Sequence, residues 1–202
     1  MGGRSKIMHW EDKYKSDLEK SGRDESMLKA LELLREKHLA PGIIVETGCQ
    51  RMINDIGGGQ STLIFADFCK EFNYHLFTVD NNPDAMEVAI DVTKEFEAFV
   101  SYVVNDSVLF LAGFNQKIDF LYLDSMDCPE YDSPTSSRLI ASQVHQYIEM
   151  ETALSKLSDD PVILLDDNLF DNGGKTRLTK FLLKERGFSE IVSGKQSLWV
   201  KS

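Results

Sequence analysis

Short strand-like runs alternate with longer helical patterns through most of this chain, and this alternation most constrains its fold. The short runs are rich in β-branched and aromatic residues, and the longer stretches place apolar residues at helical spacing. Alternation at this density predicts βαβ units with right-handed crossovers, and a parallel sheet covered by helices. The expected strands are 43–46, 75–80, 101–104, 118–124 and 162–166, and the expected helices are 24–37, 61–72, 84–99, 107–112, 137–157 and 175–186.

The end of the chain departs from this alternation. Residues 188–192 and 197–201 read as two strands separated by only Ser193, Gly194, Lys195 and Gln196. A link of this length joins antiparallel strands, because a parallel crossover needs a much longer connection. We therefore predict an α/β fold with a mostly parallel central sheet, flanked by helices and finished by a C-terminal antiparallel hairpin.

Length and composition predict a single domain. The 202 residues are 42% hydrophobic, enough to bury one substantial core, and no linker or low-complexity tract suggests a second one. We expect residues 1–40 to form an N-terminal helical segment that acts as a cap within the same domain, and residues 41–202 to form its main body. The aromatic segment from His9 to Tyr14 is a candidate lid over the functional site.

Charge and cysteine content narrow the partners and the location. The formal net charge of −11 disfavours nucleic acid, because it removes the attraction that usually drives such binding. Three cysteines without a paired spacing predict reduced thiols in a cytoplasmic protein. No apolar run approaches the roughly 18 residues that cross a bilayer, so we expect no membrane partner. A homodimer is compatible with the sequence, but no feature specifies its interface.

A glycine-rich turn after the first strand holds candidate cofactor-binding residues. It includes Glu46, Gly48, Gly59 and Ser61. Glycine lets the backbone approach a ligand, and Ser61 can cap the next helix. Asp80 ends the second strand roughly 20 residues after Gly59, the spacing at which an acidic side chain accepts hydrogen bonds from ribose hydroxyls. The alternatives are a turn that is only flexible, and an aspartate that only caps the following helix or forms an Asx turn.

Polar side chains also follow two apolar strands further along the chain. Asp124 follows one of them, and Asp167 and Asn168 follow the other. If the strands are neighbours, about 4.8 Å apart, these side chains converge as hard oxygen ligands that suit Mg²⁺ or Ca²⁺. Strand alternation sends Asp166 to the opposite side from Asp167, so Asp166 is a spare candidate. Alternatively, these residues cap helices or bond backbone amides in a protein without a metal.

Taken in order, these segments resemble the class I S-adenosylmethionine-dependent methyltransferases across nearly the whole chain. Within that class they are similar to the catechol and caffeoyl-CoA type O-methyltransferases and their macrolide-sugar relatives. The resemblance implies a Rossmann-like fold, S-adenosylmethionine as cofactor and a small-molecule methyl acceptor. It is carried by Glu46-Thr47-Gly48, Gly59-Gln60-Ser61-Thr62, Phe77-Thr78-Val79-Asp80, Asn105-Asp106-Ser107, Tyr122-Leu123-Asp124 and Leu164-Leu165-Asp166-Asp167-Asn168.

The resemblance also implies roles for individual cofactor-binding residues. Glu46, Gly48 and Ser61 would border the methionine part of the cofactor, with Gly59 in the same turn. Asp80 would hold the ribose, with Asn81 beside it. Asp106 would lie near the adenine amine, next to Ser107; a carboxylate there can accept a hydrogen bond from that amine. Asp106 and Ser107 can instead simply cap the next short helix.

For the chemistry, the resemblance implies a divalent cation, Mg²⁺, on Asp124, Asp167 and Asn168. Such an ion fixes two neighbouring hydroxyls of the acceptor and lowers the pKa of the one to be methylated. Metal-dependent relatives carry a lysine shortly after the first aspartate, but this chain does not. Asp127 is therefore the candidate general base, and Asp124 is grouped with it as catalytic.

Two other titratable residues are weaker candidates for the chemistry. Lys175 can approach the site, but a lysine at a helix start is ordinarily solvated. His145 is a lone helical histidine of the kind that is usually packed or at the surface. The loop from Cys49 to Gly58 is longer than the compact turn of the relatives and is a candidate cover for the substrate.

The expected function is Mg²⁺-dependent O-methylation of a small molecule with vicinal hydroxyls. Three alternatives stay open. The first is a metal-independent methyltransferase of the same fold. The second is a nicotinamide-dependent oxidoreductase, which the missing contiguous G-x-G-x-x-G and the terminal hairpin disfavour. The third is a catalytically silent protein that retains the cofactor pocket.

Overall fold

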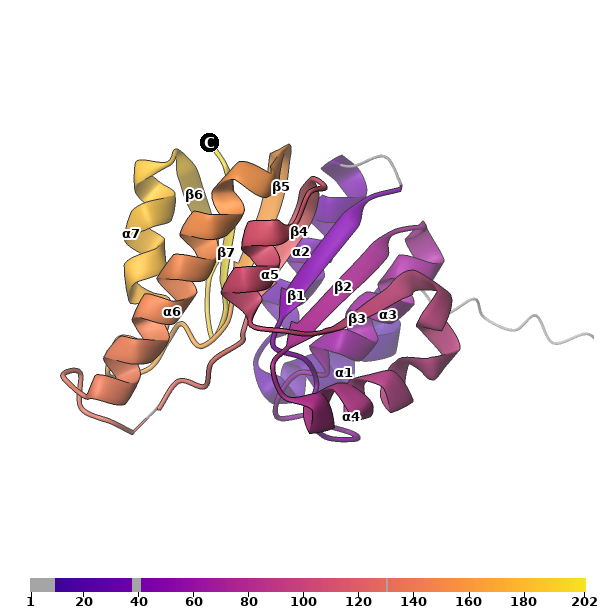
Figure 1. Ribbon diagram of the computed structural model, residues 1–202, viewed down its shortest axis with the longest axis horizontal. Coiled ribbons are helices and arrows are strands. Elements are labelled where there is room, and N and C mark those ends of the chain that lie inside the picture. The colour runs from indigo at the N-terminus through magenta and orange to yellow at the C-terminus, as the bar shows by residue number, and fades with distance from the viewer. Residues whose placement is uncertain (1–9, 38–40, 130) are drawn as a thin grey trace, which may run out of the picture.

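The computed structural model describes residues 10–37, 41–129 and 131–202, and places a seven-stranded sheet at the centre of the molecule (Figure 1). The strand order is β3-β2-β1-β4-β5-β7-β6; β1 to β5 are parallel, and β7 is antiparallel to both of its neighbours. This confirms the predicted fold class. The strands are β1 Ile43–Thr47, β2 His75–Asp80, β3 Val100–Val104, β4 Ile118–Leu123, β5 Leu157–Leu165, β6 Phe188–Ser193 and β7 Ser197–Lys201.

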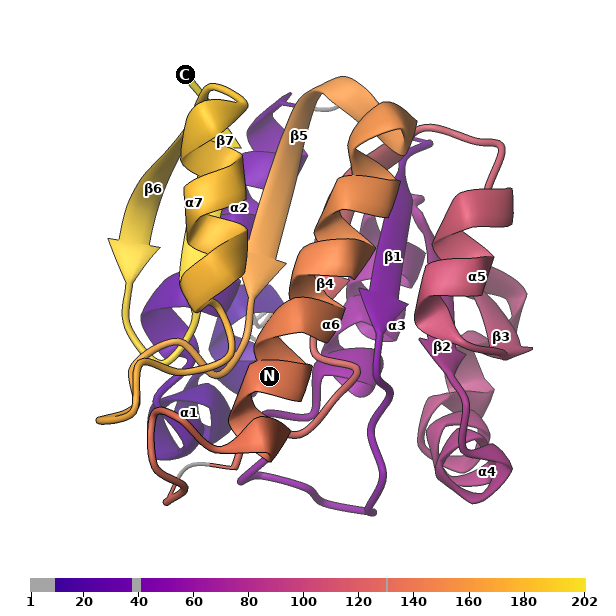
Figure 2. The same cartoon turned by 60° about the vertical axis from the view of Figure 1, so that its left-hand side comes forward.

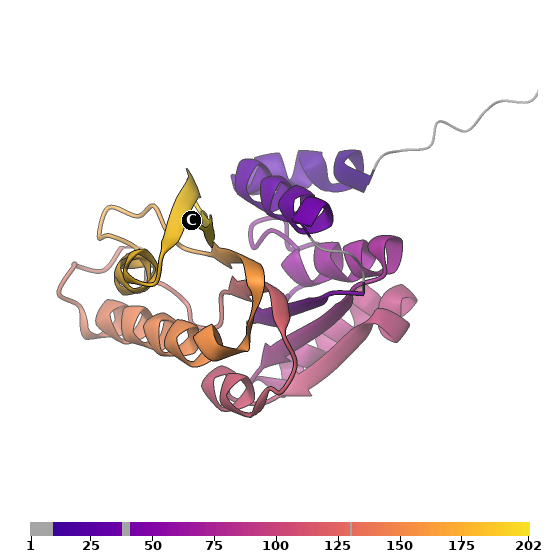
Figure 3. The ribbon, with the colours of Figure 1, turned by 90° about the horizontal axis from the view of Figure 1, so that it is seen from above.

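Helices cover both faces of the sheet, and Figure 3 shows α1 and α2 on one side with α6 on the other. The central strands are apolar on both faces, as parallel strands between two helical layers must be: Tyr122 joins the core under α1, α2 and α3, while Leu121 and Leu123 join the core under α5, α6 and α7. The helices are α1 Trp10–Ser21, α2 Asp24–Lys37, α3 Ser61–Phe72, α4 Pro83–Thr93, α5 Ser107–Gly113, α6 Ser137–Ala153 and α7 Arg177–Glu185, with 3₁₀ turns at Lys94–Phe99 and Leu154–Lys156.

Helix α1 lies within the predicted N-terminal helical segment, although the sequence assigned a helix there only to residues 24–37, and it changes the interpretation of the aromatic segment. Trp10 packs edge-on against Phe68 of α3, with ring centroids 5.3 Å apart, and Tyr14 donates a hydrogen bond to Asp67 of the same helix at 2.7 Å. These aromatic residues therefore tether α1 to the body, and the expected lid is wrong for them. His9 lies outside the described residues.

All functional candidates lie at one edge of the sheet, because the carboxyl ends of β1 to β5 meet there (Figure 2). The turn between β6 and β7 reaches the same edge, since Ser197 at the start of β7 pairs with Leu165 at the end of β5. Open α/β sheets bind ligands at this edge. Among the helices of the described segments, none is long and apolar enough to cross a membrane.

Candidate active site

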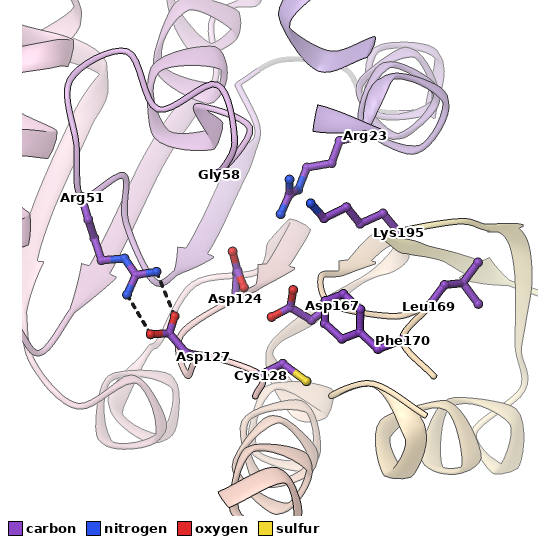
Figure 4. Close-up of a pocket in the computed structure, with 10 residues that line it drawn as sticks. All are labelled: Arg23, Arg51, Gly58, Asp124, Asp127, Cys128, Asp167, Leu169, Phe170 and Lys195. Atoms are coloured by element: carbon purple, nitrogen blue, oxygen red, sulfur yellow. Dashed lines mark hydrogen bonds and ion pairs between the residues drawn. The ribbon is translucent and has the colours of Figure 1, made fainter. Parts of the chain in front are cut away.

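The loops at the carboxyl edge enclose two pockets that meet along residues 124–127. The first, here called the β2–β3 pocket, has a volume of about 320 Å³ and is lined by Gly48, Val79, Asp80, Asn81, Asn105, Asp106, Ser107, Ser125, Met126 and His145. The second, the β4–β5 pocket, has a volume of about 710 Å³ (Figure 4). It is lined by Arg23, Arg51, Gly58, Asp124, Asp127, Cys128, Asp167, Leu169, Phe170 and Lys195.

Gly48 lines the β2–β3 pocket and lies against the backbone of Asp124, which borders the β4–β5 pocket. Its φ is +82°, and a Cβ at this position would lie 2.3 Å from the backbone oxygen of Asp124. Only glycine combines that backbone conformation with so close an approach. The turn after β1 therefore packs directly on the end of β4, and the predicted contact of Gly48 with a cofactor stays a prediction.

Glu46 lies in the interior, beneath the turn that it begins. It is fully buried, and its Oε2 accepts hydrogen bonds from the hydroxyls of Thr62 at 2.8 Å and Thr78 at 2.7 Å. Its Oε1 has no hydrogen-bond partner in the described part of the chain. Burial raises the pKa of Glu46 to about 7, although the hydroxyls of Ser61, Thr78 and Thr62 oppose the rise. Ser61 is also buried, and neither Glu46 nor Ser61 is among the residues that line the two pockets. Their predicted position beside the methionine part of a cofactor stays a prediction.

Gly59 serves a different purpose from the one predicted. Its φ is +84°, and a Cβ here would lie 2.8 Å from Cδ of Arg23. The absence of a side chain makes room for the arginine, and Gly59 is not among the residues that line the two pockets, so its assignment to the cofactor stays a prediction. Its neighbour Gly58 lines the β4–β5 pocket instead.

The carboxylate of Asp80 lines the β2–β3 pocket, with Asn81 beside it. Its Oδ2 accepts a hydrogen bond from the backbone N–H of Cys49 at 3.1 Å, and its Oδ1 accepts one from that of Asn82 at 2.8 Å. These bonds fix the carboxylate and leave each oxygen further capacity to accept. The Asx turn and the pocket-lining position, which the sequence left as alternatives, occur together.

Asp106 and Ser107 line the same pocket at the start of α5. The Oδ1 of Asp106 caps the helix by accepting from the backbone N–H of Leu109 at 2.9 Å. The hydroxyl of Ser107 lies 3.2 Å from Nε2 of His145, which also lines the pocket. The capping alternative therefore holds for Asp106, and its other oxygen remains available beside the pocket.

Lys175 occupies the space between the two strand-end carboxylates. Its side chain is 1% exposed, and its Nζ lies 2.7 Å from Oδ1 of Asp124 and 3.3 Å from Oδ2 of Asp167. The ammonium also donates to the backbone oxygen of Met126 at 2.9 Å. Three acceptors match the three N–H donors of a lysine. The residue dismissed as a solvated helix-start lysine is thus the buried centre of the site.

This cluster sets the charge states of its members. Burial opposes a charge on Lys175, but the carboxylates of Asp124 and Asp167 outweigh it and raise the lysine pKa, so the ammonium stays protonated. Burial raises the pKa of Asp124 to about 8, partly offset by Lys175 and reinforced by Asp166 and Asp167. Asp124 still borders the pocket, with its side chain 29% exposed.

Asp166 points to the other side of the strand end, as the alternation predicted. It is fully buried, and its Oδ2 accepts hydrogen bonds from Nε of Arg23 at 2.9 Å and from the hydroxyl of Tyr122. Burial opposes its charge, but Arg23 and Lys175 outweigh burial and lower the pKa of Asp166. Asp166 is therefore a permanent anion paired with an arginine.

Asn168 does not join Asp124 and Asp167, so its assignment as a metal ligand is wrong. Its Oδ1 accepts hydrogen bonds from Thr176 at 2.8 Å and Lys180 at 2.9 Å, and its Nδ2 donates to the backbone oxygen of Gly194 at 2.8 Å. The side chain thus clamps the β6–β7 turn to the end of β5. Its oxygen is already shared by two donors and faces away from the carboxylates.

Asp127 forms a two-point ion pair with Arg51, drawn in Figure 4. The distances are 3.1 Å from Nη1 to Oδ2 and 2.8 Å from Nη2 to Oδ1. The hydrogen bond from Arg51 lowers the pKa of Asp127, which makes this carboxylate a weaker base. The geometry therefore argues against Asp127 as the general base, and it ties the 49–58 loop to the segment after β4.

A divalent cation does not fit this arrangement. The position between Asp124 and Asp167 is filled by a lysine ammonium, and the third predicted ligand is turned away. Within the described segments, no group of three or more His, Cys, Asp or Glu side chains could hold a metal ion. Mg²⁺ could bind between Asp124 and Asp167 only if Lys175 moved away, because two cations would otherwise be buried side by side.

Comparison with known proteins places this site in a family. A family model described as a methyltransferase domain matches residues 55–168, more than half of the chain. The match includes the ends of β2, β3, β4 and β5, which carry Asp80, Asp106, Asp124 and Asp167. The chain belongs to this methyltransferase family.

Solved structures share the fold at low sequence identity. A methyltransferase from Podospora anserina bound to S-adenosylhomocysteine (SAH) is 14% identical, with a TM-score of 0.62 over 96% of this chain and 88% of that one. A candidate methyltransferase from Streptococcus mutans in complex with SAH is 9% identical, with a TM-score of 0.62 over 87% and 97%. A SAM-dependent O-methyltransferase from Thermotoga maritima is 13% identical, with a TM-score of 0.54 over 87% and 65%. No curated protein matches the chain.

Three basic residues at the site were missed or set aside by sequence reasoning. Arg23 precedes α2, Lys175 precedes α7 and Lys195 lies in the hairpin turn, so all three are outside the strand-end motifs. One signal was present for Lys175: the Gly173-Gly174 pair before it. Gly174 has a φ of +62°, and a Cβ there would lie 2.4 Å from the backbone oxygen of Asp167, so the turn folds tightly back onto the strand end.

Proposed function

We propose that the protein transfers a methyl group from S-adenosylmethionine to a hydroxyl of a small molecule in the β4–β5 pocket, without a divalent cation. The observation that carries the proposal is the buried ammonium of Lys175 between Asp124 and Asp167. The methyltransferase family supports the reaction class, and the SAH held by two structural neighbours supports the choice of donor.

The β2–β3 pocket is the proposed seat of the nucleoside part of the donor. Asp80 presents a fixed carboxylate that can accept from ribose hydroxyls, and Asp106 presents a second carboxylate oxygen for the adenine amine. Gly48 lets the backbone pass between the two pockets. Bound there, S-adenosylmethionine supplies the methyl group from its sulfonium sulfur.

Asp124 is the proposed general base. Its carboxylate borders the acceptor pocket, and its pKa of about 8 lies close to neutral pH, where proton acceptance and correct ionisation are best balanced. Asp124 takes the proton of the acceptor hydroxyl as the oxygen forms its bond to the methyl carbon. Lys175 stays charged, orients Asp124 through the 2.7 Å hydrogen bond and neutralises Asp167.

Without a metal, the acceptor needs no second hydroxyl for chelation. The expected vicinal diol was tied to the cation, because chelation requires two neighbouring oxygens. A single hydroxyl next to Asp124 meets the requirement of the present site. The proposal therefore keeps the small-molecule acceptor and O-methylation, and gives up Mg²⁺ and the vicinal arrangement.

The experiment is a calorimetric titration of the protein with SAH, in excess EDTA and again with Mg²⁺. We expect binding that is the same in both buffers. Asp80→Asn should raise the Kd about 10- to 100-fold, because hydrogen bonds to a charged group contribute roughly 1.5–3 kcal/mol. The matched control is Asp84→Asn, an exposed residue at the start of α4, which should bind SAH like the wild type.

Whether a divalent cation binds is tested separately. Titration of Mg²⁺ alone into the protein should give no saturable heat, and a panel of small hydroxylated acceptors should yield SAH at the same rate in EDTA. Absence of SAH binding would refute the methyltransferase proposal itself. Saturable Mg²⁺ binding that disappears in Asp167→Asn would refute only its metal-free part. SAH binding without turnover on any acceptor would instead favour the silent cofactor-binding alternative.

A further inference from the structure

Two cationic side chains reach the β4–β5 pocket with unused hydrogen-bond donors. Arg23 is only 5% exposed; its Nε donates to Asp166 at 2.9 Å and its Nη1 to the backbone oxygen of Gly57 at 2.8 Å. Its Nη2 has no partner within the described residues, and the ammonium of Lys195 has none there either. In Figure 4 both side chains extend from their own wall into the space beside Asp124 and Asp167.

The other cationic side chains around this pocket each contact a carboxylate. Asp127 is paired with Arg51, Asp166 with Arg23, and Asp124 and Asp167 with Lys175. Lys195 is the basic pocket-lining residue whose charged atom contacts no carboxylate among the described residues. An unpaired cation inside a concave site is unusual for a chain with a net charge of −11, since acidic neighbours are plentiful.

The turn that carries Lys195 is held in place from both sides. Asn168 holds the turn with two hydrogen bonds. Its backbone N–H donates to the backbone oxygen of Lys195 at 2.8 Å, and its side-chain amide donates to the backbone oxygen of Gly194. The next residue, Gln196, is fully buried and accepts a hydrogen bond from the hydroxyl of Ser26 at 2.6 Å. The backbone of the turn is thus fixed, and only the lysine side chain faces the pocket.

The strand order places this pair on the acceptor side of the site. Lys195 lies in the turn before β7, four strands from β2 and its Asp80, or about 19 Å at 4.8 Å per strand. It lies two strands, or about 10 Å, from β4 and its Asp124. A group bound by Lys195 therefore lies near the proposed base and far from the nucleoside seat.

We propose that Nη2 of Arg23 and Nζ of Lys195 bind an anionic oxygen group, a carboxylate or a phosphate, on the methyl acceptor. A guanidinium edge and an ammonium are well suited to share such a group, because hydrogen bonds between charged partners are the strong ones. The acceptor class is thus a small hydroxylated acid whose hydroxyl faces Asp124. This inference rests on the proposed function, since it assumes that the pocket holds the acceptor.

The test uses the full-length protein saturated with SAH. Inorganic phosphate, lactate and its neutral analogue lactamide are titrated separately and followed by NMR chemical shifts. We expect saturable binding of phosphate or lactate, and no saturable binding of lactamide. Lys195→Gln should weaken anion binding at least 10-fold. Lys201→Gln is the matched control, because Lys201 lies on the same hairpin at the far end of β7 and should leave binding unchanged.

A second variant tests the arginine without removing its charge. Arg23→Lys keeps a cation for the buried Asp166 but removes Nη2, and it too should weaken anion binding. The inference is overturned if the SAH-loaded protein binds neither anion, if lactamide binds equally well, or if both lysine variants behave alike. It is also overturned if Lys195→Gln weakens SAH itself, since the pair would then serve the cofactor's carboxylate. Loss of SAH binding by the wild type would instead refute the proposed function.

Discussion

The two halves of the carboxyl edge, the β2–β3 pocket and the β4–β5 pocket, are both lined by aspartates, but these aspartates have different hydrogen-bond partners. In the β2–β3 pocket, carboxylates accept hydrogen bonds from backbone N–H groups: Asp80 from Asn82 and from Cys49, and Asp106 from Leu109. In the β4–β5 pocket, carboxylates are paired with cations from distant segments. Arg23 and Asp166 are 143 residues apart, and Lys175 and Asp124 are 51 apart. Backbone amides hold the carboxylates of the first pocket, and cationic side chains hold those of the second.

Under the proposed function, this difference separates cofactor binding from acceptor choice. The β2–β3 pocket depends on loops that follow directly from the strands, so substitutions in the cationic side chains of the other half leave it intact. The β4–β5 pocket draws its charges from the start of α2, the start of α7 and the hairpin turn. Acceptor specificity can therefore change through these three segments while the donor seat stays the same.

The largest expected effect is on stability, from Lys175→Met. Methionine has a similar length but no charge, so Asp124 and Asp167 would face each other without a cation. Breaking a buried ion pair by removing one partner costs roughly 3–5 kcal/mol, because the remaining charge is left uncompensated. We expect the unfolding free energy, measured by urea denaturation at about neutral pH, to fall by about that amount.

Two further variants check that the loss comes from the charges. Lys20→Met, which removes the exposed partner of Asp17, should cost less than about 1 kcal/mol. Adding Asp167→Asn to Lys175→Met should restore part of the stability, because one of the two unpaired carboxylates is gone. A Lys175→Met protein as stable as the wild type would show that the ammonium is not the centre of the acceptor half.

The same contrast explains which parts could be predicted from the sequence. Asp80 and Asp106 line one pocket, as their positions at strand ends predicted, while their contacts with a cofactor stay predictions. The convergence of Asp124 and Asp167 was also predicted, since it needs only that β4 and β5 be neighbours. The fold class followed from the alternation and from the short link of the hairpin.

The parts of the site that were not predicted depend on contacts between segments that are far apart in the sequence. Lys175 was set aside as an ordinary helix-start lysine, because one of its partners, Asp124, is 51 residues away. Arg23 was not considered, because its partner lies 143 residues away. Asn168 was assigned to a metal by its position next to Asp167, but the hairpin turn and Thr176 compete for its amide. The bounds of helix α1 were not predicted because its apolar residues, Trp10, Tyr14 and Leu18, are too few to dominate a charged segment.

The next effect concerns the interior of the cofactor half, where Glu46 makes stability depend on pH. Its pKa of about 7 when folded lies above its ordinary value of 4.5, so the folded state holds a proton that the unfolded state has lost. The free energy of unfolding should therefore fall as the pH rises from about 4.5 to 7, by about 3 kcal/mol from this group. Glu46→Gln, which cannot ionise, should remove that fall.

The measurement is urea denaturation of both proteins at pH values on either side of this window. The stability of Glu46→Gln relative to the wild type should increase toward the alkaline end. Glu71→Gln, an exposed residue of α3, is the control and should stay within about 0.5 kcal/mol of the wild type throughout. A constant difference between Glu46→Gln and the wild type would mean that Glu46 stays ionised through its hydrogen bonds to Thr62 and Thr78.

The smallest effect on stability is expected where the two halves are joined, at the ion pair between Arg51 and Asp127. Both side chains are exposed, 58% and 77%, so Arg51→Ala should change the unfolding free energy by less than about 1 kcal/mol. The pair is nevertheless the contact that ties the 49–58 loop to the segment after β4, so its loss should speed amide hydrogen exchange in that loop. Exchange in the neighbouring helix α3 should not change, because its first turn is held from within by Glu46 and Thr62. Faster exchange in both would make the loop and the helix one unit, and unchanged exchange in both would mean that the loop is held by its own turns, such as the hydrogen bond that Gly58 donates to Asp55.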